Sequence, residues 1–388
     1  TCALPISSID GAKLQLRGEA PRIKAIIPTL KSLKDAAVVL IAHQGRFGIE
    51  DAKEKPYTLK IHAERLNQLM GGNVKFVDDT FGEKAQSAIK ALKPGEVLVL
   101  ENVRQWEKEE KTKKVEDAEG TELIKNLSPL FDYFVNDAFG AAHRAHVSLV
   151  GWPKLVAGPL VQKELEMVKK LFEPKRPSVW IVGGAKAIDK FKALKYNLDA
   201  GHIDKALVAG LTATLFLEAQ GIDMGEANRK PVEEDLAKNK DDIAAVWDKH
   251  KDKIVLPQDL VYEDNGSRKQ ITTAQAGGEG KLTGDIGDKT IAEFCGIIRS
   301  AGTIVANGPP GIFEKDVFKK GTDAVLQACG EAVDKGAFVA VGGGDFGEAA
   351  EKHPSGKKMV ISTGGGALLE ILSGKEVPLI KVLKTKMP

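Results

Sequence analysis

The chain has 388 residues, 43% of them hydrophobic and 28% charged, which is typical of a soluble globular protein and long enough to favour two domains. The formal net charge of +2 argues against a polybasic surface for nucleic acid or membranes, the longest apolar run (36–42) is too short to span a bilayer, and no leading segment resembles a signal peptide. Cys2, Cys295 and Cys329 are far apart and form no CxxC motif, so we expect neither a disulfide nor a cysteine-bound metal, and we expect a cytoplasmic location.

Strands alternate with helices in the first half. Short β-branched or apolar runs predict strands at 36–43, 74–77, 96–103 and 131–139, and helical spacing of apolar residues predicts helices at 57–70 and 83–92. Such alternation is typical of a parallel sheet covered by helices. The charged run 107–119 predicts mostly a solvated face or loop, without a functional site.

An amphipathic helix follows a break marked by Pro153 and Pro159, and it runs to Pro174. The alternation then restarts, with strands predicted at 178–184, 204–210, 253–257, 302–310, 337–345 and 358–366. The sequence therefore predicts the α/β class, with two Rossmann-like domains, each a parallel sheet with helices on both faces, joined by a hinge helix. The predicted bounds are 1–152 and 177–362 for the domains, 153–176 for the linker and 363–388 for a C-terminal segment.

The stretch GGAKAIDK (183–190) follows a predicted strand. Gly183 and Gly184 allow a ligand to approach the backbone, and the helix behind them offers free N–H groups to an anion. Lys186 and Lys190 are four residues apart, so we expect both on one helix face, where an anion between them would relieve their repulsion. The alternative is a structural turn with two solvated lysines.

GGGDFG (342–347) formally matches the dinucleotide fingerprint GxGxxG. A NAD site also requires an acidic residue at the end of the next strand, but that strand ends in a second glycine cluster, TGGG (363–366). We therefore disfavour a NAD oxidoreductase. No Walker A pattern is present in the sequence. ANGPPGIFE (306–314) is a further strand end, either a pocket wall or a plain turn, and its position beside the other glycine-rich strand ends favours a phosphate-binding crevice.

Basic residues follow the strands of the first half in the same way. His43 and Arg46 follow one strand, Arg104 follows another, and the motif HRAH (143–146) follows a third. Guanidinium groups suit bidentate contact with phosphate or carboxylate, and histidine can donate to the same oxygens. We expect a site for a small polyanion at this edge, with His146 structural. Positioning and charge cancellation of this kind are what phosphoryl transfer requires.

These motifs, in this order, resemble the phosphoglycerate kinase family: LENVR, VNDAFGAAHRAHVSLVG, GGAKAIDK, ANGPPGIFE, KKGT, VGGGD and ISTGGGALLE. The resemblance covers nearly the whole chain, and stretches such as ANGP and DNGSR are most similar to the archaeal branch. It implies reversible phosphoryl transfer between 1,3-bisphosphoglycerate and ADP, giving 3-phosphoglycerate and Mg-ATP, in two domains that close by hinge bending. It also implies that the segment beyond about residue 365 packs on the first domain.

The resemblance also implies roles for individual residues. Those that would bind phosphoglycerate are Arg22, His43, Arg46, Arg104, His143 and Arg144. Those that would line the nucleotide pocket are Gly183, Gly184, Lys186, Lys190, Gly210, Leu256, Asn307, Pro309, Glu314, Gly342, Gly343, Gly344 and Asp345. Asp345 would hold Mg²⁺ through the nucleotide. Those that would act on the transferring phosphoryl group are Arg22, Lys186, Lys190, Gly364, Gly365 and Gly366. The implied partners are small molecules only, with no nucleic acid and no membrane, and the chain is expected to be a monomer.

The amino end departs from the family pattern. Pro5 matches a family proline, which puts Thr1 and Ala3 where aspartate and asparagine usually stand, so the first strand is missing or altered and glycerate binding is expected to weaken. Ala20, Pro21, Pro310 and Phe346 are smaller departures that leave the main charges in place. The alternative to an active kinase is therefore a nucleotide-binding relative with weak or no kinase activity.

Overall fold

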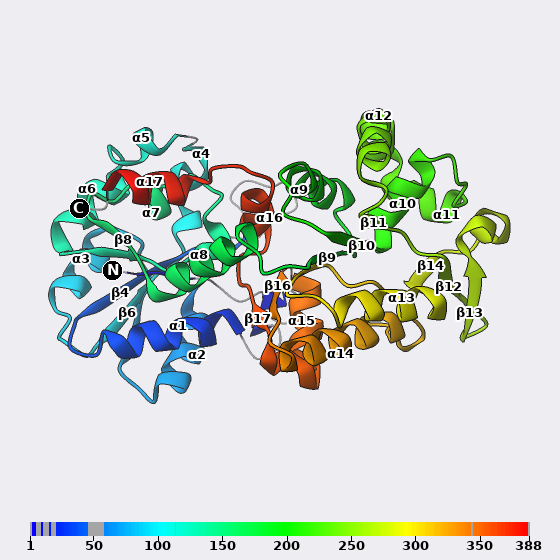
Figure 1. The fold of residues 1–388 in the computed structure, drawn as a ribbon. Helices are drawn as coiled ribbons and strands as arrows, with labels where there is room; N and C mark the ends of the chain where they lie inside the picture. The colour runs from blue at the N-terminus through cyan, green and yellow to red at the C-terminus, as the bar shows by residue number, and fades with distance from the viewer. Residues whose placement is uncertain are drawn as a thin grey trace. The chain divides into compact units, whose positions relative to one another are not determined.

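The computed structural model describes residues 2–4, 9–10, 15–16, 21–45, 58–112, 114–342 and 344–386. The chain forms two compact units, Thr1–Leu165 with Glu376–Pro388, and Glu166–Lys375. The division falls inside the helix α8 (Pro159–Phe172) (Figure 1). The domain limits that the sequence predicts, and the roles assigned to those domains, remain predictions.

A six-stranded parallel sheet forms the centre of the first unit. Its order is β5-β6-β4-β1-β7-β8, with bounds β5 Val74–Val77, β6 Val97–Leu100, β4 Val38–Ala42, β1 Cys2–Leu4, β7 Phe134–Asn136 and β8 Leu155–Ala157. Every residue of β4 and β6 is buried, as expected for strands covered on both faces. The helices α1 (Pro21–Ser32) and α2 (Lys60–Met70) lie on the side of the sheet opposite α7 (Val147–Val150) and α17 (Pro378–Lys386) (Figure 1).

The core of the first unit lies beneath α1 and α2. Ile26 of α1 and Leu66 of α2 are buried against Leu40 of β4 and Val99 of β6. The spacing of Ile23, Ile26 and Leu30 places these side chains on one face of the helix. The remaining elements of the unit are α3 Glu83–Lys90, α4 Lys108–Lys111, α5 Val115–Ala118, α6 Glu122–Leu127 and a small antiparallel pair, β2 Ile9–Asp10 and β3 Gln15–Leu16.

The first strand is present at the amino end. The sequence predicts that this strand is missing or altered, and the structure places β1 between β4 and β7, paired in parallel with both. Residues 2–4 therefore form a strand of this sheet. Thr1 and Pro5, which were used to align the amino end with the family pattern, lie outside the described residues.

The last helix packs on the first unit. The backbone N–H of Leu379 in α17 donates to the carbonyl of Ala142 at 3.1 Å, and Lys386 donates to the carbonyl of Trp152 at 2.8 Å. Leu379, Val382 and Leu383 are buried. These contacts account for the inclusion of the chain's last segment in the first unit.

The second unit is built on another six-stranded parallel sheet. Its order is β11-β10-β9-β15-β16-β17, with bounds β11 Ile254–Val255, β10 Lys205–Val208, β9 Ser178–Val182, β15 Thr303–Asn307, β16 Phe338–Gly342 and β17 Val360–Ile361. Its helices are α9 Ala187–Asp199, α10 Gly210–Ala219, α11 Glu226–Arg229, α12 Glu233–His250, α13 Asp288–Ile298, α14 Lys320–Asp334, α15 Gly344–Lys352 and α16 Gly366–Leu372. The predicted α/β class with two parallel sheets is confirmed (Figure 1).

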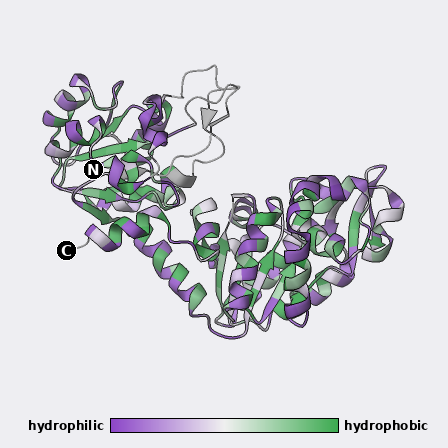
Figure 2. Ribbon diagram, turned by 90° about the horizontal axis from the view of Figure 1, so that it is seen from above, coloured by the Kyte–Doolittle hydropathy of each residue, from purple (hydrophilic) through white to green (hydrophobic). Residues whose placement is uncertain are grey.

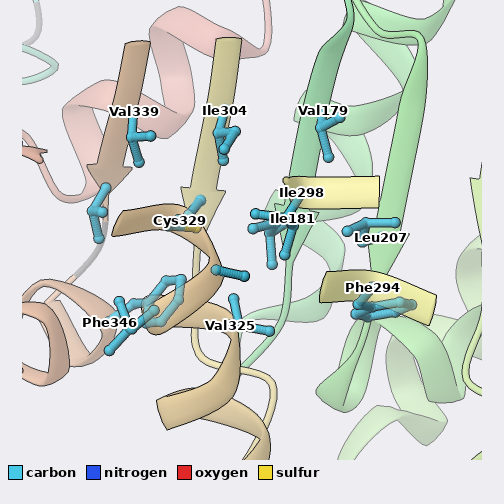
Figure 3. Close-up of a cluster of buried hydrophobic side chains, with 14 of the residues drawn as sticks. Val179, Ile181, Leu207, Phe294, Ile298, Ile304, Val325, Cys329, Val339 and Phe346 are labelled. Carbon is cyan, nitrogen blue, oxygen red and sulfur yellow. The ribbon is translucent and has the colours of Figure 1, made fainter. Parts of the chain in front are cut away.

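One face of this second sheet packs on α13, α14 and α15. Figure 3 shows Ile181 of β9 and Ile304 of β15 among Phe294, Val325 and side chains of the same cluster. In Figure 2 the strands of each unit are coloured mainly as hydrophobic, whereas the helices carry both colours. Among the described residues, every helix is too short or too polar to cross a bilayer.

A smaller antiparallel sheet, β13-β12-β14, extends the second unit. Its strands are β12 Asp259–Asp264, β13 Ser267–Thr272 and β14 Thr283–Ile286. The first two form a hairpin whose turn residues, Asn265 and Gly266, both have positive φ values of 49° and 77°. This feature was not predicted, although Asn-Gly is a strong hairpin signal.

Candidate active site

Three strand ends carry the basic residues of the first unit. His43 directly follows β4, Arg104 lies in a short 3-10 turn after β6, and His143 and Arg144 follow β7. Because the sheet is parallel, the carboxyl ends of these strands lie at the same edge. Arg22 lies in α1, but its side chain is outside what the structure describes, as is the whole of Arg46.

Asn102 joins the loops that follow β4 and β6. Its side-chain oxygen accepts from the backbone N–H of Gln44 at 3.0 Å and of Arg104 at 3.1 Å, and its amide donates to the carbonyl of Gln44 at 2.9 Å. The guanidinium of Arg104 reaches the same neighbouring loop, where it donates to the carbonyl of Gly45. These bonds hold the ends of two strands together.

The imidazoles pack close to these guanidinium groups. The rings of His43 and His146 meet edge to face with centroids 5.8 Å apart, and Arg144 Nε donates to His143 Nε2 at 3.3 Å. Burial, helped by the charges of Arg104, Arg144 and His143, lowers the pKa of His146 to about 3. The structure therefore brings five of the basic residues named from the sequence into one cluster, and His146 is a neutral, buried member of it.

Asp137, in the same motif, has a structural position. One carboxylate oxygen accepts from the backbone N–H groups of Leu160 at 2.8 Å and Val161 at 3.0 Å in the first turn of α8, and the other accepts from the hydroxyl of Thr29 at 2.5 Å. A carboxylate at a helix N-terminus satisfies free N–H groups and the helix dipole. Asp137 thus fixes the start of α8 relative to β7.

The charged run 107–119 is mostly exposed, as predicted, but it contributes two carboxylates to the cluster. Glu109 is fully buried and accepts from the N–H of Ser148 at 3.0 Å and from its hydroxyl at 2.5 Å. Glu110 pairs with Arg104 Nε at 3.1 Å. Burial raises the pKa of Glu109 to about 7 against the opposing effect of those hydrogen bonds. No local sequence signal identified these residues, because alternating charges within a short run normally face water.

In the second unit, glycine-rich loops meet at the carboxyl edge of the sheet. The N–H of Gly183, after β9, donates to the carbonyl of Asn307 at 3.1 Å, and the N–H of Leu211, after β10, donates to that of Gly184 at 3.2 Å. Gly210 has φ +55°, and a Cβ on it would lie 2.6 Å from the nitrogen of Gly184. The close approach of these backbones requires glycine.

The two lysines differ from the predicted arrangement. Helix α9 begins at Ala187, and Lys186 precedes it in a left-handed conformation with φ 59°, so the two side chains do not share a helix face. Lys186 is exposed. Lys190 is 7% exposed, and its ammonium group donates to the carbonyls of Gly183 and Ala185. The loop therefore curls around the Lys190 ammonium.

Burial disfavours the charged form of Lys190. Burial lowers the pKa of Lys190 to about 8, with Asp345 acting against the shift and Lys186 adding to it. Asp345 is exposed in the first turn of α15. Lys186, Lys190 and Asp345 are thus near enough to interact electrostatically.

The other predicted nucleotide residues are distributed around this edge. Leu256 directly follows β11, Pro309 follows β15 by two residues, and Glu314 is exposed in the turn beyond it. Asn307 is 5% exposed, and its amide nitrogen has no hydrogen-bond partner among the described residues. The glycines Gly342, Gly344, Gly364, Gly365 and Gly366 lie at the ends of β16 and β17 or the starts of the helices after them. Gly343 lies outside the described residues.

Asp345 fits a role in holding Mg²⁺ together with nucleotide phosphates. Mg²⁺ prefers oxygen ligands and is commonly held in kinases by one or two carboxylates together with phosphates and water. Asp345 offers an exposed carboxylate at the edge where Lys190 lies. Among the described residues, no group of three or more histidine, cysteine or acidic side chains is placed to hold a metal alone.

Comparisons of sequence and of structure with known proteins all find phosphoglycerate kinases. The family model for phosphoglycerate kinase matches residues 16–375. A phosphoglycerate kinase of Archaeoglobus fulgidus is 37% identical over 375 residues, which cover 94% of this chain and 89% of the relative. One of Methanococcus maripaludis is 40% identical over 383 residues, with 93% and 89% covered. The crystal structure of phosphoglycerate kinase from Pyrococcus horikoshii OT3 matches with a TM-score of 0.88 and 33% identity, covering 100% of this chain and 96% of that chain.

Proposed function

The chain belongs to the phosphoglycerate kinase family, and we propose that each of its two units binds one substrate of the reaction. It is a phosphotransferase with a carboxyl group as acceptor. The reaction moves a phosphoryl group reversibly between 1,3-bisphosphoglycerate and ADP, giving 3-phosphoglycerate and ATP. The identity to named phosphoglycerate kinases disfavours a relative without kinase activity.

The first unit binds the phosphoglycerate. The observation that carries this assignment is the cluster of basic side chains at the strand ends: His43, Arg104, His143 and Arg144 lie around His146. Guanidinium and imidazole groups together can donate to both the phosphate and the carboxylate of this substrate. By their motif positions, Arg22 and Arg46 join this set.

The second unit binds the nucleotide. The glycine loops at this edge, the start of α9 and the cations Lys186 and Lys190 suit its phosphates. Asp345 holds Mg²⁺ through those phosphates, which supplies further charge cancellation. The residues proposed to line the pocket are Gly183, Gly184, Gly210, Leu256, Asn307, Pro309, Glu314, Gly342, Gly343 and Gly344.

Lys190, Lys186 and Arg22 neutralise the charge on the group in transfer, and Gly364, Gly365 and Gly366 give it backbone N–H groups. A phosphoryl transition state spreads negative charge over three oxygens, so fixed cations and N–H donors lower its energy more than that of the bound substrates. The chain's residues need to supply no covalent chemistry. We also propose a cytoplasmic monomer that acts on small molecules, without nucleic acid or membrane partners.

A coupled assay of ATP consumption tests this function. We expect turnover that requires 3-phosphoglycerate and Mg²⁺, and we expect Arg104→Ala to raise KM for 3-phosphoglycerate by about tenfold or more through loss of a charged hydrogen bond. KM for ATP is expected to stay unchanged in that variant. ATP consumption that ignores 3-phosphoglycerate would refute the proposal.

Nucleotide binding is expected to draw a proton from solution at pH 8. The pKa of Lys190 is about 8 in the free protein, and nearby phosphates favour the charged form and raise it. Half of the Lys190 side chains are charged at pH 8 in the free protein, so at most about 0.5 proton is taken up per ADP bound. Calorimetry of ADP binding in two buffers of different ionisation enthalpy measures this number. An enthalpy that is the same in both buffers would contradict the contact between Lys190 and the nucleotide.

A further inference from the structure

The cationic cluster of the first unit contains a carboxylate that its proposed ligand would repel. Glu110 lies 3.1 Å from Arg104 Nε and 3.9 Å from His146 Nε2. Its side chain is 22% exposed, whereas that of Arg104 is 6% exposed. A negative charge beside an anion site weakens ligand binding unless it does something else there.

Glu110 and the loop after β4 hold the Arg104 guanidinium from two sides. The carboxylate of Glu110 forms an ion pair with Arg104 Nε at 3.1 Å, and an Nη1–H group donates to the carbonyl of Gly45. These are two anchor points on one rigid, planar fork of donors. A fork that is oriented before the ligand arrives spends less binding energy on ordering itself.

Glu109 fixes the segment that carries Glu110. Helix α4 has only four residues, too few to be stable by itself. Glu109 is fully buried, and both of its oxygens accept hydrogen bonds from Ser148 in α7. His146 Nδ1 lies 4.0 Å from the same carboxylate. The turn is therefore tied to the segment that carries the HRAH motif.

We propose that Glu110 is a positioning residue, which orients Arg104 for phosphoglycerate, and that Glu109 anchors the turn that carries it. This inference rests on the proposed function, because it takes Arg104 to be a ligand of phosphoglycerate. Glu110 itself does not touch the substrate. The negative charge of Glu110 repels the anionic ligand, and the orientation that it gives to Arg104 offsets this repulsion.

The test compares Glu110→Ala with Glu110→Gln. The alanine variant removes the carboxylate that is paired with Arg104 Nε and is expected to raise KM for 3-phosphoglycerate about tenfold, while KM for ATP stays unchanged. The glutamine variant loses the charge but keeps a polar oxygen beside the guanidinium, and it is expected to restore part of the binding. Glu107→Ala is the matched control, because Glu107 lies in the same segment with a 54% exposed side chain paired to Lys111, and we expect it to behave as wild type.

A double-mutant cycle with Arg104→Lys completes the test. Lysine cannot present a planar fork, so adding Glu110→Ala to Arg104→Lys is expected to raise KM no further. Additive effects would overturn the proposal. So would a lower KM for 3-phosphoglycerate in both Glu110 variants, which would show simple charge repulsion, or an unchanged KM in Glu110→Ala. The proposed function fails separately, if the wild-type chain shows no turnover that depends on 3-phosphoglycerate.

Discussion

Replacing Lys190 by methionine is expected to lower kcat about 100-fold or more, the loss typical of removing one fixed group that stabilises transition-state charge. Lys190 lies where the loops after β9 and β15 meet, and its ammonium group donates to the carbonyls of Gly183 and Ala185. Methionine keeps the length and the apolar stem but carries no charge. A steady-state assay with saturating ATP and 3-phosphoglycerate measures the loss.

The same substitution, Lys190→Met, is expected to stabilise the folded protein although it lowers kcat. Because burial lowers the pKa of Lys190 from 10.5 to about 8, the folded protein holds this proton less tightly than the unfolded chain does. Below pH 8 the charged form weakens the fold, and that cost is relieved as the pH rises from 8 to about 10.5. Lys190→Met is therefore expected to raise the free energy of unfolding by about 3 kcal/mol at pH 7, with a smaller gain at pH 10.

Lys192→Met is the control for both measurements. Lys192 lies in the same helix, α9, and is exposed. We expect neither its kcat nor its thermal unfolding to differ from wild type. A Lys190→Met protein with nearly full kcat would show that the buried ammonium serves only the fold. A variant that is less stable at pH 7 would show that its hydrogen bonds outweigh the cost of burial.

The two sheets, and the residues that lie at the carboxyl ends of their strands, could be predicted from the sequence because both depend on local signals. β-branched runs end in glycine clusters in one half and in basic residues in the other, and parallel strands bring such ends together. The structure bears out the grouping of His43, Arg104, His143 and Arg144 on these grounds. The roles of these residues toward a ligand remain proposals.

What the sequence did not predict depends on contacts between distant segments. Glu109 is buried because Ser148, 39 residues away, supplies two donors to it. Lys186 was expected on one helix face with Lys190 because the two are four residues apart, but the chain takes a left-handed conformation at Lys186 before it enters α9. Neither the burial of Glu109 nor the backbone conformation of Lys186 can be predicted from local composition or helical periodicity.

Changing Gly308 to alanine is expected to disrupt the nucleotide edge of the second unit. Gly308 has φ +85°, and a Cβ there would overlap the carbonyl oxygen of Gly183 and the ammonium group of Lys190. One of the two loops must move, which displaces Lys190 from the carbonyls that surround it. We expect Kd for ADP to rise about tenfold or more, since positioned charged contacts are lost, together with a lower melting temperature. Calorimetry and thermal unfolding measure the two effects.

Gly336→Ala separates close approach from backbone strain. Gly336 has φ +87°, nearly the same conformation as Gly308, but a Cβ there would meet nothing within 4 Å. Its cost is expected to be the strain alone, about 1 kcal/mol of unfolding free energy, with Kd for ADP unchanged. The difference between the two variants then measures what the contact between the loops contributes. If Gly308→Ala binds ADP as tightly as Gly336→Ala, the close approach of Gly183 and Gly308 has no part in nucleotide binding, and the assignment of this edge to the nucleotide loses its main structural support.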